Sequence, residues 1–399
     1  MLHRVDEEVP AVKRIAILGT VCIGLLVATG HAQQAPPNAS PEPEDHSPHT
    51  VQLVAVNTDV KLEVLDWGGT GRPVILLAGL GYDAHVFDTF APKLAAAYHV
   101  YGISRRGFGA SSTPQPDGRN YSADRLGDDI LAVMDALKIA RPVLVGHSIA
   151  GEELSSIGSR YPEKVAGLVY LDAGYAYAFY NDAAKQGQDA VADITKVQVE
   201  LDAFKNFLPA KERRERAEHL LNVSLPRLER DIQDGLKQDK NAPDPPPPPD
   251  TPRTRASIAI RRGTEIYAGV KCPVLAIFAV PHDFGPLGNG DPAARVEMVA
   301  KDIALVSEQA DAFQAGNPQA HVVRIANANH FVFRSNEAEV LREMNEIGIC
   351  FTQVTPTGCG LLIFRHRDGG FFPRVRDRSS RLAEPVGRRA CPDFLSVAD

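Results

Sequence analysis

The sequence predicts an α/β fold: a mostly parallel sheet of about eight strands, with helices on both faces and a helical cap insertion. Three observations predict it. Apolar runs recur along the chain, and several are nearly continuous, as strands covered on both faces require. Helix-like segments alternate with these runs. The alternation stops between residues 175 and 271 and then resumes, which is typical of an insertion into an ongoing sheet.

The chain begins with a segment typical of export signals. Lys13 and Arg14 precede the apolar run 15–30, which is shorter than the roughly 20 residues of a membrane-spanning helix. Ala32 then follows in an A-x-A-like cleavage site. We therefore expect a signal peptide over 1–32, no stable membrane span, and an exported protein, periplasmic or extracellular. An uncleaved N-terminal anchor is the less favoured alternative.

After the predicted signal peptide we expect a leader segment and then the first part of the hydrophobic core domain. Residues 33–50 are rich in Pro and polar side chains, which predicts a flexible leader. The first core part, 51–174, contains a helix over Asp124–Lys138, where apolar residues recur at the helical period. Its predicted strands are Val51–Val56, Val60–Asp66, Pro73–Gly79, His99–Ser104, Pro142–Gly146 and Val165–Asp172.

The remaining chain divides into a cap, a second core part and a tail. The cap insertion, 175–271, is charged and helix-prone, and its proline run Asp244–Asp250 predicts an exposed spacer. The second core part, 272–347, is predicted to hold strands within Cys272–Asp283 and Ala320–His330 and helices near 293–315 and 336–346. The tail, 348–399, is rich in Arg, Gly and Pro, which predicts a disordered or atypical extension.

Charge and cysteine content narrow the function classes. The formal net charge of −7 argues against nucleic acid as a partner, because phosphate binding needs clustered Lys and Arg. Loss of the signal leaves Cys272, Cys350, Cys359 and Cys391, for which three connectivities are possible and none is preferred. The oligomeric state is not predicted.

No sequence pattern predicts a metal or a cofactor. The chain contains no C-x-x-C motif. The nearest approach to a metal motif is "HSPH" at His46–His49, which lies in the predicted leader. In that setting we expect solvated histidines rather than a ligand pair.

Ser148 occupies the corner between a predicted strand and a predicted helix, in the stretch "GHSIAG". A serine hydroxyl is a poor nucleophile unless a base removes its proton. A tight strand-to-helix turn exposes the hydroxyl above the sheet, and Gly146 and Ala150 provide the small neighbours that such a turn needs. The helix start also offers unpaired N–H groups to an oxyanion.

At these residues the chain resembles the α/β-hydrolase superfamily, over about 51–346. "GHSIA" resembles its G-x-S-x-G motif, with Ala150 in the last glycine position. "LLAGLG" resembles its H-G-x-G oxyanion loop with Ala78 in place of His, and "SRRGFGASS" resembles D-x-R-G-x-G-x-S with Ser104 in place of Asp. "NANHFVF" resembles the late loop that carries the catalytic His.

The resemblance implies a serine–acid–histidine triad. Ser148 would be the nucleophile, His330 the general base, and Asp283 the acid that orients it. Asp172, at the end of an earlier strand, is the alternative acid, and Asp291 lies near Asp283. The backbone N–H groups of Leu80 and Ile149 would form the oxyanion hole.

Four other polar or aromatic features have simpler expected roles. His147 should face away from the nucleophile and pack, and His282 is expected to be a loop or strand-end residue. Glu152 suits the helix dipole, and a contact with substrate is its less favoured role. "GYAYAFY" at 174–180 is expected to pack at the base of the cap.

The expected function is a capped serine hydrolase that cleaves a carboxylic ester, or less readily a lactone or amide, of a small molecule without a cofactor. Three alternatives stay open: a C–C bond hydrolase, a cofactor-free perhydrolase, and a non-catalytic member that binds a small molecule. Dehalogenase and epoxide hydrolase relatives resemble this chain but carry Asp at the nucleophile position, where Ser148 stands.

Overall fold

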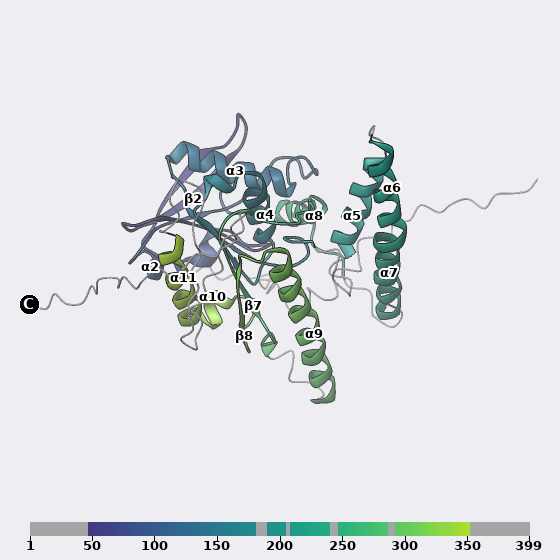
Figure 1. Cartoon of the computed structure of the whole chain (residues 1–399). Coiled ribbons are helices and arrows are strands. Elements are labelled where there is room, and N and C mark those ends of the chain that lie inside the picture. The colour runs from purple at the N-terminus through teal and green to yellow at the C-terminus, as the bar shows by residue number, and fades with distance from the viewer. Residues whose placement is uncertain (1–46, 181–189, 205–207, 240–245, 286–291, 352–399) are drawn as a thin grey trace, which may run out of the picture. The chain divides into compact units, whose positions relative to one another are not determined.

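The computed structural model describes residues 47–180, 190–204, 208–239, 246–285 and 292–351 (Figure 1). Within them, strands form one sheet in the order β1-β2-β4-β3-β5-β6-β7-β8. These are β1 (Thr50–Ala55), β2 (Lys61–Gly68), β3 (Pro73–Leu77), β4 (His99–Ile103), β5 (Val143–His147), β6 (Gly167–Leu171), β7 (Val274–Ala279) and β8 (His321–Ile325). β2 is antiparallel to β1 and β4, and the other pairings are parallel. The predicted α/β class and mostly parallel sheet are confirmed.

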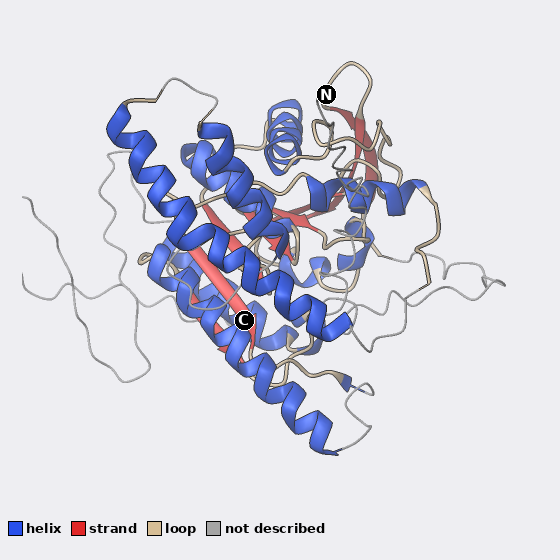
Figure 2. Ribbon diagram, turned by 90° about the vertical axis from the view of Figure 1, so that its right-hand side faces the viewer, coloured by secondary structure: helices blue, strands red, loops and turns tan. Residues whose placement is uncertain are grey.

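Helices cover both faces of this sheet (Figure 2). One face packs against α3 (Ala123–Leu137), α4 (Ala150–Arg160), α8 (Pro252–Arg262) and α9 (Pro292–Gly316). The other face packs against η1 (Ala84–Phe87), α2 (Ala91–Leu94), α10 (Val332–Ser335) and α11 (Glu337–Phe351). A short helix, η2 (Pro162–Lys164), links α4 to β6.

The apolar runs are nearly continuous because successive residues of a strand point to opposite faces. In β3, Ile75 and Leu77 join the core with α3 and α4, whereas Val74 and Leu76 join the core with η1 and α2. All four are buried. A central strand covered on both sides therefore needs an apolar residue at every position.

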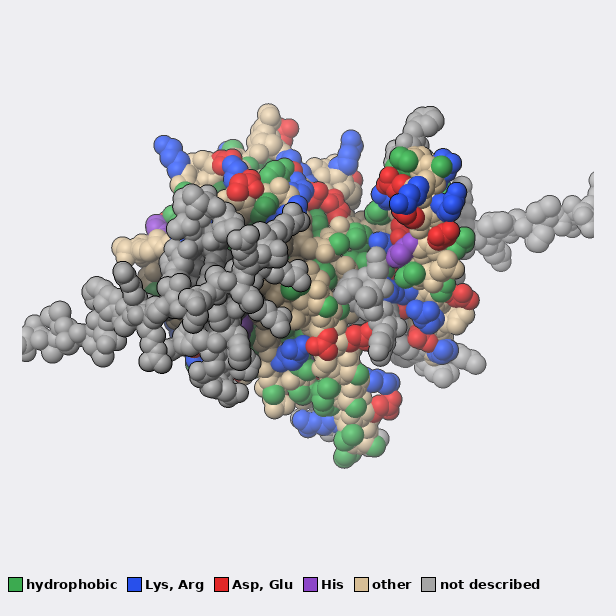
Figure 3. All heavy atoms as spheres, viewed as in Figure 1, with side chains coloured by type: hydrophobic (Ala, Val, Ile, Leu, Met, Phe, Trp, Pro, Cys, Tyr) green, Lys and Arg blue, Asp and Glu red, His purple; other side chains and the backbone are tan. Residues whose placement is uncertain are grey.

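Helices of the predicted cap lie between β6 and β7 in the sequence. They are α5 (Ala190–Ala203), α6 (Ala210–His219), the π-helical η3 (Leu220–Ser224), α7 (Leu225–Asp239) and α8. α6 has no buried residue, and side chains of both charges are interspersed over α6 and α7 (Figure 3). Residues 246–250 of the proline run are exposed, as predicted.

The chain ends fall mostly outside the described residues. The predicted signal peptide and residues 33–46 lie outside them, as do Cys359, Cys391 and most of the tail. α11 continues to Phe351, so the first residues of the predicted tail are helical. Cys272 is a buried free thiol, and burial raises its pKa to about 12. Among the described residues, the helices lack the combination of length and apolar character that crossing a bilayer requires.

Candidate active site

Four adjacent strands each deliver a reactive side chain just beyond their carboxyl ends. Ser148 follows β5, Asp172 follows β6, and His330 lies in the loop after β8. His282 lies three residues beyond the end of β7. Because these strands are parallel, their carboxyl ends meet at one edge of the sheet.

Ser148 sits in a sharply bent turn between β5 and α4. Its φ of 54° lies in the left-handed region, which side chains other than glycine seldom adopt. Such strain persists only where the surroundings over-determine it. Here the Ser148 N–H donates to the Leu171 carbonyl at 3.3 Å. A Cβ on Gly151 would lie 2.0 Å from the Ala173 carbonyl oxygen, so glycine is required for α4 to pass the end of β6.

The side chains of Ser148, His330 and Asp172 form a continuous hydrogen-bonded relay. Ser148 Oγ lies 2.9 Å from His330 Nε2, and His330 Nδ1 lies 2.6 Å from Asp172 Oδ2. A carboxylate can only accept, so Nδ1 carries the proton and Nε2 accepts from the hydroxyl. Ser148 is half-buried and Asp172 is fully buried. This arrangement holds a base against an accessible hydroxyl.

The preference for Asp283 over Asp172 as the acid is wrong in this structure. Asp283 is exposed, and its carboxylate accepts from the N–H of Gly285. The segment after β7 is extended, with His282 bridged to Ala328. Neighbouring residues of extended chain point to opposite sides, so His282 turns inward and Asp283 turns outward. Asp291 lies outside the described residues.

Asp172 receives four hydrogen bonds, and three of them come from groups that the sequence did not predict to belong to the site. Tyr175 Oη donates to Oδ1 at 2.8 Å, the Ala279 N–H donates to Oδ1 at 3.1 Å, and His282 Nε2 lies 2.8 Å from Oδ2. Burial alone would raise the pKa of Asp172, but the charge and hydrogen bonds of His282, together with those of His330, outweigh it and hold this pKa below its usual range.

His282 is clamped between two carboxylates. Its Nε2 faces Asp172, and its Nδ1 lies 2.9 Å from Oδ1 of Asp302 on α9. Burial would lower the pKa of His282, but Asp172 and Asp302 raise it to about 10. His282 is therefore an imidazolium at neutral pH, rather than the plain strand-end residue that the sequence suggested. Asp302 lies within α9, and no pattern in the sequence indicated that it would contact His282.

Replacing His282 by Gln is expected to remove a pH-dependent part of the stability. The folded-state pKa of His282 is raised, from 6.5 to about 10. Its contribution is therefore complete below about pH 6.5 and is lost as the pH rises toward 10. The variant should have a lower free energy of unfolding than wild type at pH 6. This deficit should be about 2–4 kcal/mol larger at pH 6 than at pH 10. Denaturant melts at both pH values measure this.

The matched control for this experiment is His321→Gln. His321 also faces a carboxylate, Glu343 at 3.4 Å, but its side chain is partly exposed. Its loss should cost little at either pH, since exposed ion pairs contribute little. A His282→Gln deficit that is equal at pH 6 and pH 10 would show that His282 is neutral in the folded protein.

The predicted oxyanion loop passes close to Ser148. A Cβ on Gly79 would lie 2.7 Å from His147 Nδ1 and 3.2 Å from Ser148 Cβ, so this position must be glycine. Arg105 donates to the carbonyls of Ala78 at 2.6 Å and Gly79 at 3.0 Å. In a trans peptide the C=O and the following N–H point in opposite directions, so the N–H of Leu80 points away from Arg105.

Two of the three departures from the resembled motifs, at Ala78 and Ser104, have local explanations. At position 78 the contact is made by the backbone, because Arg105 donates to the Ala78 carbonyl, so the contact does not depend on the side chain. Arg105 is itself fixed by Glu153 of α4, at 2.8 Å and 3.0 Å. Ser104 donates to Glu63 Oε2 at 2.6 Å, so a carboxylate from β2 stands beside the position where the motif has Asp.

His147 and Glu152 are both buried, His147 against His330 and Glu152 in the first turn of α4. His147 Nε2 lies 3.0 Å from the His330 carbonyl, and the two rings lie 4.7 Å apart, so His147 packs against and positions the His330 loop. Burial and the nearby His330 lower the pKa of His147. Burial and the Glu153 charge raise the pKa of Glu152, whose Oε2 accepts from Thr264 at 3.4 Å. The predicted interaction with the helix dipole does not by itself explain why the Glu152 carboxyl is fully buried.

Asp172, His282 and His330 also bring three potential metal-ligand atoms within 4.8 Å of one another. Each of these atoms already has a hydrogen-bond partner within the cluster, at 2.6–2.8 Å. His330 meanwhile turns its other nitrogen to Ser148. The contacts therefore already pair these atoms by hydrogen bonding, with Asp172 as the shared acceptor, and suit orientation of His330 better than ligation of a cation.

Comparison with known proteins identifies the family. A family model described as the alpha/beta hydrolase fold matches residues 72–336, which is most of the chain. The chain belongs to the α/β-hydrolase fold family. The resemblance seen in the motifs around Ser148, Leu80 and His330 is thereby confirmed at the level of the family.

Curated relatives within this family share limited stretches with the chain. It is 33% identical over 117 residues to a fluoroacetate dehalogenase from Burkholderia sp., covering 29% of this chain and 38% of that protein. It is 31% identical over 167 residues to a serine hydrolase-like protein from Danio rerio, covering 41% and 49%. The chain thus matches less than half the length of these two relatives.

Solved structures align over more of the fold at lower identity. A hydrolase from Pseudomonas aeruginosa PA01 is 19% identical, with a TM-score of 0.48, over 75% of this chain and 98% of that one. A thermophilic esterase from Thermogutta terrifontis is 16% identical, with a TM-score of 0.47, over 76% and 98%.

Proposed function

We propose that this α/β-hydrolase-fold protein is a serine hydrolase that cleaves a carboxylic ester of a small molecule through an acyl-enzyme. The observation that carries the proposal is the relay of Ser148, His330 and Asp172, with separations of 2.9 Å and 2.6 Å. A hydroxyl held against an imidazole, which a buried carboxylate orients, is the arrangement that nucleophilic acyl transfer needs.

The reaction follows from the protonation states of the relay. His330 Nε2 takes the Ser148 proton as Oγ attacks the ester carbonyl, and the backbone N–H groups of Leu80 and Ile149 stabilise the oxyanion. The imidazolium then protonates the leaving alcohol, and an acyl-Ser148 remains. Water, deprotonated by His330, attacks the acyl group and releases the acid. Asp172 stays ionised throughout and stabilises each imidazolium form.

A fluorophosphonate probe tests the nucleophile directly. The folded protein should be labelled on Ser148, as peptide mass spectrometry would show, and Ser148→Ala should not be labelled. Denatured wild type is the control for chemical reactivity alone, because the relay does not exist in the unfolded chain. Labelling of the native protein that equals labelling of the denatured protein would contradict an activated serine.

Substrate class is tested with a panel of p-nitrophenyl esters of increasing acyl length, lactones and amides. We expect ester turnover that Ser148→Ala abolishes. A second candidate, C–C bond hydrolysis, is favoured by one relative, a 2-hydroxymuconate semialdehyde hydrolase from Pseudomonas sp. strain CF600, to which the chain is 31% identical over 127 residues. A vinylogous diketone in the panel distinguishes the two, because it contains no ester bond.

We also propose that the enzyme acts after export. The support is the basic pair and apolar run before Ala32. Fractionation of the native host, followed by N-terminal sequencing of the mature chain, tests this. Cleavage after Ala32 is expected.

A further inference from the structure

The residues just before β1 pack on the folded domain beside η1. Ser47 Oγ accepts from Trp67 Nε1 at 2.8 Å and donates to the Asp88 carbonyl at 3.1 Å. The His49 ring lies edge-on to the Trp67 ring, with centroids 5.4 Å apart, and its side chain is only 5% exposed. The expectation that the HSPH motif is solvated is therefore wrong at Ser47 and His49, while His46 lies outside the described residues.

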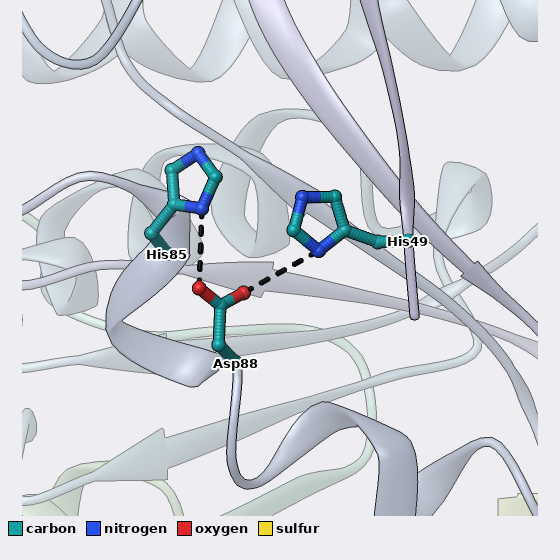
Figure 4. Close-up of side chains that lie close together, drawn as sticks. All are labelled: His49, His85 and Asp88. Carbon is teal, nitrogen blue, oxygen red and sulfur yellow. Dashed lines mark hydrogen bonds and ion pairs between the residues drawn. The ribbon is translucent and has the colours of Figure 1, made fainter. Parts of the chain in front are cut away.

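His49, His85 and Asp88 converge there (Figure 4). Both imidazole rings direct a nitrogen at the Asp88 carboxylate, one at each oxygen (Figure 4). His85 Nδ1 lies 3.1 Å from Asp88 Oδ2, and His49 Nδ1 lies 3.6 Å from Asp88 Oδ1. The donor atoms of the three residues all lie within 4.8 Å of one another.

These separations are those of ligands around a metal ion. Zinc–nitrogen and zinc–oxygen bonds of about 2.0–2.1 Å place the ligand atoms of a tetrahedral site about 3.3 Å apart. The two nitrogen–oxygen distances in this cluster, 3.1 Å and 3.6 Å, lie on either side of this value. The distance of 3.6 Å from His49 to Asp88 is also longer than an ordinary N–H···O hydrogen bond.

The surroundings of the three side chains hold them near one another. The other ring nitrogen of His85, Nε2, lies 3.9 Å from Oε1 of the buried Glu63, which is beyond hydrogen-bond distance but places a negative charge behind the ring. His49 is held by the Trp67 ring, and the Asp88 main chain is tied to Ser47. His85 is partly exposed, which leaves a route for the ion and space for water as a further ligand.

We propose that His49 Nδ1, His85 Nδ1 and the Asp88 carboxylate bind one divalent transition-metal ion such as Zn²⁺. Two imidazoles and one carboxylate suit such ions. The ion would tie the segment that enters β1 to η1, whose chain continues directly from the oxyanion loop at 79–82. Its role is to stabilise this part of the domain, and it takes no part in the reaction proposed for Ser148.

The test uses the full chain without an affinity tag, stripped with chelator and then dialysed. Isothermal titration with Zn²⁺ should show one site, and saturating Zn²⁺ should raise Tm, since a ligand that binds only the folded state stabilises it. His49→Gln and His85→Gln should each weaken binding at least about tenfold and remove most of the Tm rise. Cobalt(II) bound in place of Zn²⁺ should give visible absorption that both variants lose.

His99→Gln is the matched control, because His99 also pairs with one carboxylate, Asp66 at 2.9 Å, but the described residues place no third ligand near it. It should keep wild-type affinity. Melts in chelator show whether each variant folds, and Asp88→Asn provides a third variant if one does not. Absence of a site in wild type, or equal Zn²⁺ affinity in wild type, His49→Gln and His85→Gln, would overturn the proposal. The latter result would place the ion elsewhere, for example at the relay.

Discussion

Replacing Asp172 by Asn is expected to lower kcat for ester cleavage by about 10⁴, whereas Asp283→Asn should stay within about twofold of wild type. Asp172 Oδ2 holds the proton-bearing Nδ1 of His330 at 2.6 Å. An amide there cannot stabilise the imidazolium, and its NH₂ favours the wrong tautomer of the ring. Steady-state kinetics on both variants, with the ester that wild type turns over best, provide the measurement.

Asp283→Asn is a suitable control for Asp172→Asn, because the same substitution is made at two residues that differ in position. Asp283 is an exposed carboxylate beyond the end of β7, so Asp283→Asn controls for the loss of one negative charge near the site. Asp172 also accepts from His282 and Tyr175, so the stability of Asp172→Asn must be checked by thermal melt before its rate is interpreted. A larger loss at Asp283 than at Asp172 would reverse the assignment of the acid.

The second large effect is expected at the other two members of the relay. Ser148→Ala and His330→Ala should each lower kcat by about 10⁴–10⁶, and the double variant should be no slower than either single variant. The reason is that the hydroxyl has no nucleophilic strength without its base, and the base has no proton to take without the hydroxyl. Rates at saturating ester for the three variants test this.

Ser159→Ala is the control, since Ser159 lies on α4, the helix that follows Ser148, and its hydroxyl donates to the Gly269 carbonyl at 2.7 Å. It should retain wild-type kcat. Losses at Ser148 and His330 that multiply in the double variant would show two groups acting independently, and the acyl-enzyme pathway would have to be abandoned. A tenfold loss at His330 would also contradict its role as the base.

The sequence could predict the sheet and the sharp turn that holds Ser148, because both depend on local pattern. Continuous apolar runs such as Pro73–Gly79 are required wherever a strand is covered on both faces, and β3 (Pro73–Leu77) falls within that run. Small residues around Ser148 are required wherever a strand turns sharply into a helix. The steric contacts at Gly146 and Gly151 show the same demand in three dimensions.

The choice of acid could not be made in this way. Asp172 and Asp283 both follow apolar strands, and the sequence offers no measure of which one faces the His330 loop. What separates them is the direction of the chain after β7, which turns His282 inward and Asp283 outward. The alternation of an extended segment could have suggested that these neighbours face opposite ways, but it could not say which of them faces in.

The sequence by itself determined the strands, their order along the chain, and the hydroxyl and imidazole after β5 and β8, because each of these is encoded within a short stretch. Only the tertiary structure decided the partners: Asp172 for His330, Asp302 for His282, and the meeting of His49 with His85 and Asp88. Hydrogen bonds and ion pairs act over about 3 Å. Residues separated by tens or hundreds of positions come within that distance only when the sheet and its helices are packed.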